Sequence, residues 1–296
     1  MRFQYIKEHK DELNIKRACK TLNVSYSGYY AHLHRKPSNR SIEDEILAEK
    51  IKVIFDNHKS RYGSIRIRKV LQNQEILISR KRVVKLMRKL GLTVKGTRYN
   101  CRKLGGAKTG EANPNLLNQC FQATAINRVW LSDITYIPTQ KGFVYLCVFL
   151  DVFSRKITGW SMSTKMTDDL SSGAFMQAYN REHPAEGLIV HTDQGAQFTS
   201  NNFRLVLHQH GVQLSNSRRG NPYDNAMMES FYRTIKRELI DDISFETHEQ
   251  AQMAVFKYIE CYYNSLRMHT SLGFLSPIQY EKEFLQNQLN LVSKKG

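Results

Sequence analysis

Hydrophobic residues in the first third of the chain recur every three to four positions, which is the spacing of amphipathic helices. One such segment opens with Ser41, whose hydroxyl can cap the amide end of a helix. The last segment places four apolar side chains on its predicted inner face, namely Val83, Val84, Met87 and Leu90. The pattern predicts helices over residues 11–35 (a short pair), 41–57, 64–74 and 79–90.

From Trp130 onward the pattern changes to runs of apolar, aromatic and β-branched residues, which are typical of strands. A helix-start signal at 222–225 precedes four apolar residues at helical spacing, namely Met228, Phe231, Ile235 and Leu239. Strands are predicted over 130–138, 143–152, 156–163, 187–191 and 212–215, with helices over 168–182 and 201–210. This order fits an α/β ribonuclease-H-like fold, a mixed five-stranded sheet with flanking helices, but order alone leaves other α/β arrangements open.

The net charge of +17 lies almost entirely ahead of these strands. Residues 1–110 hold 27 Lys/Arg and 9 Asp/Glu, whereas residues 111–296 hold 17 and 18. A basic excess confined to one third of a chain favours polyanion binding. Two short helices with a basic second member fit a helix-turn-helix, and a small bundle with a solvated basic exterior is the alternative. The candidate DNA contacts on the second helix are Arg80, Lys81, Arg82, Lys85 and Arg88.

Residues 93–127 separate the two patterns and are rich in Gly, Asn and Lys without a sustained period. We expect a basic, extended linker whose order comes from bound nucleic acid or from the neighbouring core. The predicted units are an N-terminal helical segment (1–38), a helix-turn-helix-like DNA-binding region (39–92), the linker (93–127), a ribonuclease-H-like core (128–285) and a C-terminal tail (286–296).

Composition excludes several classes of protein. No run approaches the roughly 18 apolar residues of a membrane span, and the charged start lacks the apolar stretch of a signal peptide, so a cytoplasmic protein is expected. The five cysteines are scattered without a Cys-x-x-Cys pair, at positions 19, 101, 120, 147 and 261. They indicate a reducing compartment and argue against a disulfide framework or a zinc module.

Three acids, each within its own motif, are the candidate chemistry. Asp133 lies in Trp-Leu-Ser-Asp-Ile-Thr-Tyr, Asp193 in His-Thr-Asp-Gln-Gly-Ala-Gln-Phe, and Glu229 in Asn-Ala-Met-Met-Glu-Ser-Phe. The intervals between them are 59 and 35 residues. Carboxylates from three separate elements can hold two Mg²⁺ ions about 3.5–4 Å apart for phosphoryl transfer. The alternative is three ordinary solvated surface acids.

These motifs, together with Tyr263-Asn-Ser-Leu-Arg-Met-His-Thr-Ser-Leu-Gly273, resemble the integrase-type core with two aspartates and a glutamate of bacterial insertion-sequence transposases. The chain is most similar to the product of the second reading frame (the OrfB type) in the insertion-sequence-three family. Arg61-Tyr-Gly63 and Lys85–Leu92 also match this family's upstream region, so the resemblance covers nearly the whole chain. No His-His-Cys-Cys zinc module of the retroviral integrases precedes the core.

The resemblance implies a transposase that acts without a high-energy cofactor. Asp133, Asp193 and Glu229 would hold two Mg²⁺ or Mn²⁺ ions. Water would cleave at an insertion-sequence end, and the freed 3′ hydroxyl would then join target DNA by direct transesterification. A homo-oligomer is implied, because two DNA ends must meet. The family also implies an upstream-frame product or a fusion with it as a partner, and this chain lacks a leucine-heptad segment.

The last acid shares a predicted helix face with two cations. Glu229, Arg233 and Lys236 stand at i, i+4 and i+7, so the cations can reach DNA phosphates beside a metal ligand. In the wider integrase family a basic residue seven positions after the glutamate has this role. The spacing alone favours an exposed Glu229–Arg233 ion pair worth only about 0.2–0.5 kcal/mol, and the flanking motifs favour the site.

Other polar residues receive smaller roles. His191 points to the same side of its strand as Asp193 and could contact a ligand, although a hydrogen-bonded structural histidine is at least as good an interpretation. Asp151 is expected to face a turn. Asn264, Arg267 and His269 are expected to lock the closing helix against the core.

Three alternatives to a transposase stay open on the sequence. A ribonuclease-H-like DNA nuclease or resolvase would cut without joining, and a non-catalytic DNA-binding regulator of transposition would need none of the acids. A covalent tyrosine recombinase is conceivable with 15 tyrosines, but no Arg/His/Tyr arrangement rivals the acidic one.

Overall fold

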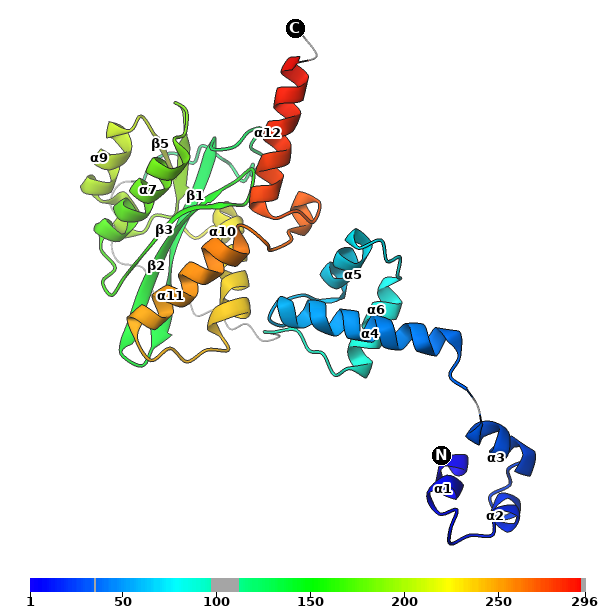
Figure 1. Ribbon diagram of the computed structural model, residues 1–296. Coiled ribbons are helices and arrows are strands. Elements are labelled where there is room, and N and C mark those ends of the chain that lie inside the picture. The colour runs from blue at the N-terminus through cyan, green and yellow to red at the C-terminus, as the bar shows by residue number, and fades with distance from the viewer. Residues whose placement is uncertain (35, 97–111, 294–296) are drawn as a thin grey trace.

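A computed structural model describes residues 1–34, 36–96 and 112–293 (Figure 1). Its first six helices are α1 (Arg2–Glu8), α2 (Ile15–Thr21), α3 (Tyr26–Leu33), α4 (Asn39–Asn57), α5 (Ser64–Asn73) and α6 (Arg80–Lys89). The sheet and the helices within it follow, as β1 (Val129–Thr139), β2 (Gly142–Asp151), β3 (Ile157–Ser163), α7 (Asp168–Glu182), β4 (Ile189–Thr192), α8 (Ala196–Thr199), α9 (Asn201–Gln209) and β5 (Gln213–Asn216). The chain closes with η1 (Pro222–Asn225), α10 (Ala226–Ile235), η2 (Lys236–Ile240), α11 (His248–Tyr258), η3 (Ile259–Tyr263), η4 (Thr270–Leu272) and α12 (Pro277–Ser293).

Helices α1–α3 form a small module that lies apart from the rest of the protein in Figure 1. Ile6, Cys19 and Tyr29 make its buried cluster, one from each helix. The predicted pair over 11–35 is confirmed as α2 and α3, which Asn14 and Ser25 cap through their side-chain oxygens. Helix α1 was not predicted, because its seven residues bury one side chain and show little periodicity.

Helices α4–α6 confirm the predicted helical region, with two corrections. Ser38, not Ser41, caps α4: its Oγ accepts the Ser41 backbone N–H at 3.2 Å, so the helix starts two residues early. On α6, Leu86 is buried in place of Val84, which is 37% exposed. The difference is one of helical phase, since Val83, Leu86, Met87 and Leu90 follow the three-to-four-residue spacing more closely.

The sheet has five strands in the order β3-β2-β1-β4-β5. Strands β1–β2 and β2–β3 pair antiparallel, whereas β1–β4 and β4–β5 pair parallel. This confirms the mixed five-stranded sheet. One face packs on α7 and α9 through the cluster around Phe149, Phe175 and Phe203. The opposite face packs on α10 and α11, where Met228, Phe231, Ile235 and Leu239 are buried as the stripe predicts (Figure 1).

The helix-turn-helix-like region shares its hydrophobic cluster with the α10–α11 face of the core. Arg61 donates through Nε to the backbone oxygen of Glu238 at 3.1 Å, and the Tyr62 hydroxyl donates to the backbone oxygen of Leu266 at 3.2 Å. Regions that the sequence presents as separate units are therefore packed and hydrogen-bonded together. Their boundaries at 92 and 128 stay predictions.

Part of the predicted linker is attached to the sheet. Residues 97–111 lie outside the described residues, but Asn113 donates its backbone N–H to Asn216 Oδ1 at 2.8 Å and Leu116 donates to Ser215 Oγ at 2.9 Å. Leu117 is buried in the core. Order in this stretch thus comes from the neighbouring core, one of the two predicted sources.

Three remaining predictions concern the tail, the cysteines and the membrane. The predicted tail (286–296) begins inside α12, which continues unbroken to Ser293. Four cysteines are free thiols, and Cys101 lies outside the described residues. Within the described ranges, no helix is both long and apolar enough to cross a bilayer.

Candidate active site

Strand pairing brings Asp133 and Asp193 to one edge of the sheet. The parallel register of β1 and β4 ends with Ser132 opposite Thr192, and each aspartate is the next residue of its chain. The two carboxylates therefore leave neighbouring strands at the same level. This is the position where β4 ends and where the backbone can turn away from the sheet.

Helix α10 brings Glu229 to the same place. Tyr232, three residues later on α10, donates its hydroxyl to the backbone oxygen of Asp133 in a short hydrogen bond. Because positions three apart share a helix face, this bond fixes the side of α10 that carries Glu229 beside β1. The buried side chains of Met228 and Ile235 pack α10 against the sheet.

Loop contacts set the orientation of both aspartates. Asp193 Oδ1 accepts the Gly195 backbone N–H at 2.9 Å, and Asp133 Oδ1 accepts that of Ile134 at 2.7 Å. A Cβ on Gly195 would come within 3.0 Å of Asp193 Oδ1, so a larger residue there would crowd the carboxylate. Asn216 Nδ2 donates to the Asp193 backbone oxygen at 3.1 Å, which ties the end of β4 to β5.

The loop before α10 is anchored by a different acid. Asp224 accepts two hydrogen bonds from the Arg218 side chain, at 2.9 and 2.8 Å, and one from Asn115 at 2.9 Å. The Arg218 hydrogen bond holds the pKa of Asp224 well below its ordinary value. Asp224 therefore favours its ionised form, and its contacts hold the loop from which α10 and Glu229 follow.

Asp133 feels the charges of the other two candidate acids. Burial first, and then the negative charges of Asp193 and Glu229, raise the pKa of Asp133 well above its ordinary value, while Lys236 acts in the opposite direction. Burial also raises the pKa of Asp193, against the effect of the Gly195 N–H. Added positive charge, such as a bound cation, would stabilise the ionised form of these buried carboxylates.

A divalent cation fits this donor set. Oxygen ligands suit Mg²⁺, which is usually held by one or two carboxylates together with waters and substrate phosphates rather than by a complete protein cage. Among residues 1–34, 36–96 and 112–293, no three His, Cys, Asp or Glu side chains are grouped as a metal site. Asp133 is the acid on which both Asp193 and Glu229 act electrostatically.

Comparison with known proteins gives the family. Models described as an integrase core domain match residues 123–222 and 210–277, and a model described as an HTH-like domain matches residues 41–99. The chain is 56% identical over 250 residues to the transposase for insertion sequence element IS904 of Lactococcus lactis subsp. lactis strain IL1403, covering 84% of this chain and 99% of that one. It is 36% identical over 287 residues to transposase InsF for insertion sequence IS3A of Escherichia coli strain K12, covering 96% and 100%. The chain belongs to the insertion-sequence-three family of transposases.

Solved structures that resemble this transposase include retroviral integrase cores. The catalytic core domain of HTLV-2 integrase in complex with magnesium, in its trimeric form, aligns with a TM-score of 0.43 at 21% identity, over 54% of this chain and 99% of that one. The catalytic core domain of BIV integrase aligns with a TM-score of 0.41 at 18% identity, over 55% and 99%.

Lys236 of the transposase lies at the junction of two helix types. Helix α10 ends at Ile235, and Lys236 begins the π-helical turn η2, which the regular spacing in the sequence did not predict. Its Nζ lies 5.1 Å from the ring centroid of Tyr136 on β1, close enough for a cation–π contact. The positive charge of Lys236 lowers the pKa of Asp133, which is consistent with a position near the acids. Arg233 is exposed on the same helix.

The predicted DNA contacts on α6 divide into two groups. Arg80, Lys81, Lys85 and Arg88 are exposed. Arg82 instead donates to Asp44 at 2.7 Å and to Glu43 at 3.0 Å, so it ties α6 to α4. Arg82 thus contacts α4 in this arrangement, and its role as a DNA contact stays a prediction.

His191 and Asp151 have structural surroundings. His191 is buried, bonded to Ser215 Oγ at 2.8 Å and to Ser217 Oγ at 3.1 Å, which confirms the structural interpretation. Asp151 is also buried and accepts the Ser154 N–H and hydroxyl, both at 2.8 Å, across the β2–β3 turn. It faces a turn as predicted, and burial raises its pKa to about 6.

The polar residues after η3 lock the closing segment, as predicted. Asn264 accepts the Ile157 N–H and donates to the Ile157 oxygen, both at 2.9 Å. Arg267 forms a buried bidentate pair with Glu238 of η2, at 2.9 and 3.0 Å. Sequence reasoning missed Glu238 and Tyr232, because both look like ordinary residues of a helix and only the fold supplies their partners.

Proposed function

We propose that Asp133, Asp193 and Glu229 are the metal-binding carboxylates with which this transposase cuts and joins DNA. The supporting observation is their placement: Asp133 in β1 and Asp193 directly after β4 stand at the same level of neighbouring strands, and the charges of Asp193 and Glu229 act with burial to raise the pKa of Asp133. The donor set suits Mg²⁺ or Mn²⁺, so we propose that these three acids would hold two ions.

The first proposed step hydrolyses a phosphodiester bond, and the second exchanges one phosphodiester bond for another. At an insertion-sequence end, the water oxygen bonds to phosphorus, the 3′ oxygen leaves, and the water proton passes to solvent. The freed 3′ hydroxyl then bonds to a target phosphorus and displaces that strand's 3′ oxygen, so no high-energy cofactor is consumed. The bound ions would lower the pKa of the attacking oxygen and stabilise the leaving oxygen.

The residues of the chain have distinct parts in this proposal. Asp133 in β1 and Asp193 directly after β4 are each fixed by a backbone N–H. Glu229 completes the set from α10. Lys236 holds a DNA phosphate or terminal base near the ions without binding them. The exposed cations of α6 bind DNA phosphates away from the reacting acids.

Partners follow from the same reaction. Both ends of an element and a target must be held together, so we propose a homo-oligomer, joined in some assemblies by the upstream-frame product or a fusion with it. We also propose that it works in the cytoplasm, where bacterial DNA lies.

A strand-transfer assay tests the proposal. The full chain would be mixed with Mg²⁺, a target plasmid, and duplexes ending in the two termini of its own element, either intact or pre-cleaved at the 3′ end. Joining of the pre-cleaved end, lost on chelation with EDTA, is the expected result. Cleavage of the intact end without any joining would mean a nuclease. Full regulatory activity of Asp193→Asn in cells would mean a non-catalytic regulator.

A further inference from the structure

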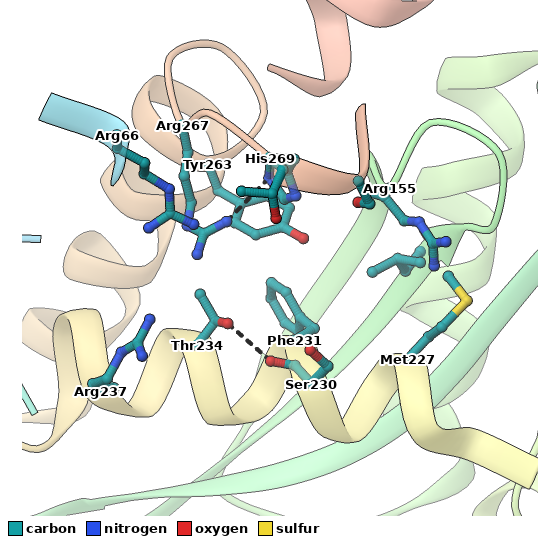
Figure 2. Close-up of a pocket in the computed structure, with 13 residues that line it drawn as sticks. Arg66, Arg155, Met227, Ser230, Phe231, Thr234, Arg237, Tyr263, Arg267 and His269 are labelled. Carbon is teal, nitrogen blue, oxygen red and sulfur yellow. Dashed lines mark hydrogen bonds between the residues drawn. The ribbon is translucent and has the colours of Figure 1, made fainter. Parts of the chain in front are cut away.

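A pocket of about 290 Å³ lies across α10 from the acids (Figure 2). Four residues of α10 line it, namely Met227, Ser230, Phe231 and Thr234, and they sit roughly 100–160° around the helix from Glu229. Figure 2 shows these residues on one side of the cavity and Arg66, Arg155, Arg267 and His269 on the other. Arg66 comes from α5, so the pocket lies at the seam between the helix-turn-helix-like region and the core.

Positive charge in this pocket exceeds the negative charge around it. Arg66, Arg155, Arg237 and Arg267 line it, and none of its described lining residues is acidic. One buried carboxylate, Glu238, serves three of these arginines. It is 2.9 Å from Arg267, 3.4 Å from Arg237 and 3.9 Å from Arg66.

Arg155 has no such partner. Its Nε is buried without a hydrogen bond to any described residue, and the Arg237 Nε is in the same state. The nearby Asp151 attracts Arg155, but that carboxylate is occupied by the N–H groups of Asn127 and Ser154. A buried guanidinium nitrogen without an acceptor is costly, and structures normally satisfy such a group with a protein, water or ligand partner.

The pKa of His269 also reflects the positive charge of these arginines. Burial, followed by the positive charges of Arg267, Arg66 and Arg155, lowers its pKa to about 2. The neutral ring can then accept from Arg267 at 3.3 Å. Burial and the arginine charges thus act together to keep the imidazole neutral.

We infer that this pocket, the arginine pocket, binds a backbone phosphate of the DNA strand that runs to the acids. Guanidinium groups match phosphate oxygens in pairs, and the Ser230 and Thr270 hydroxyls at the rim can donate to the same group. The volume falls below the roughly 300–1,000 Å³ of sites for drug-sized ligands, which suits one phosphate rather than a whole nucleotide cofactor.

The inference rests on the proposed function for its choice of DNA. A strand held at the seam can reach Glu229 by passing over α10. The width of a helix is about 10 Å, so the bound phosphate lies within a few nucleotides of the reacting one. The arginine pocket would therefore position the strand without taking part in the reaction.

Methylphosphonate interference tests the inference without any chemistry. Element-end duplexes would carry one uncharged methylphosphonate at successive positions, and binding by the full chain would be measured without divalent metal. For the wild type, one position near the end should weaken binding roughly 10- to 100-fold. Arg155→Gln should weaken binding of unmodified DNA by a similar factor, lower the salt slope by about one, and be insensitive to that same position.

Matched variants separate folding from binding. Arg155→Lys should keep part of the affinity, and Arg128→Gln, an exposed arginine of the core, should bind like the wild type. Thermal melting in inorganic phosphate gives a second readout: the wild type and Arg128→Gln should be stabilised more than Arg155→Gln.

The outcomes are distinct. Unchanged affinity and salt slope for Arg155→Gln, or equal sensitivity of both proteins to every methylphosphonate, would overturn the inference. A phosphate-dependent melting difference without any DNA effect would assign the pocket to free phosphate and overturn the DNA assignment. Failure of strand transfer in the wild type, with the interference pattern intact, would instead count against the proposed function alone.

Discussion

The two sides of helix α10 carry opposite imbalances of charge. On one side Glu229 joins Asp133 and Asp193, and the acids lack a matching cation. On the other side four arginines line the pocket, and three of them share Glu238. Both imbalances destabilise the protein alone and are relieved by what we propose it binds, metal ions on one side and a DNA phosphate on the other. A single helix can in this way couple DNA placement to the position of a catalytic carboxylate.

Substitution of the acids should have the largest effect. Asp133→Asn, Asp193→Asn and Glu229→Gln should each reduce cleavage and joining by on the order of 10³-fold or more, because each removes a metal ligand worth several kcal/mol. DNA binding without metal should persist or improve, since negative charge is lost. Glu186→Gln, at an exposed site, is the matched control. Near-normal strand transfer by one of the three would remove that residue from the site.

The glutamate on the other side should behave in the opposite way. Glu238→Gln leaves Arg267 buried without a counter-charge, so the free energy of unfolding should fall by about 3–5 kcal/mol. Glu229→Gln should leave stability equal or higher. Urea unfolding of the two variants measures the difference. Equal stability of both would mean that the two sides of α10 do not differ as described.

The sequence predicted the acidic side far better than the basic side. The acids lie in contiguous motifs, and the strand pattern places one in the first strand and one after the fourth, so Asp133 and Asp193 follow from periodicity together with the family resemblance. The arginine pocket draws on α5, the β2–β3 turn, α10 and the segment after η3. No local pattern marks Arg66 or Arg155, because their common position depends on how distant segments pack.

Helix starts and helix types were predicted less well than helix existence. The start of α4 differed by two residues because Ser38 and Ser41 are both good caps. The π-helical turn at Lys236 has no signal in the apolar stripe, since Leu239 stays buried in either geometry. These differences arise where tertiary contacts decide between local alternatives of similar free energy.

Lys236 gives a graded test on the acidic side. Lys236→Ala should reduce strand transfer by roughly 10- to 100-fold through poorer positioning of DNA, while metal binding and the fold are retained. Lys236→Arg should fall between the two, because its planar head is an imperfect substitute for an ammonium group. Low salt should relieve part of the loss, as the remaining phosphate contacts strengthen. Equal activity of wild type and Lys236→Ala across a salt titration would assign this lysine to the solvated surface.

The smallest effects are expected on α6, where two neighbouring cations should differ in kind. Lys81 is exposed, so Lys81→Ala should weaken DNA binding a few-fold and lower the salt slope by about one, without changing stability. Arg82→Ala breaks the contacts to Asp44 and Glu43, so it should lower the free energy of unfolding slightly and leave the salt slope nearly unchanged. Binding measured over a range of salt, together with urea unfolding, separates the two. The reverse pattern, with Arg82 setting the salt slope, would mean that it releases its acids when DNA binds and that the sequence-based prediction was right.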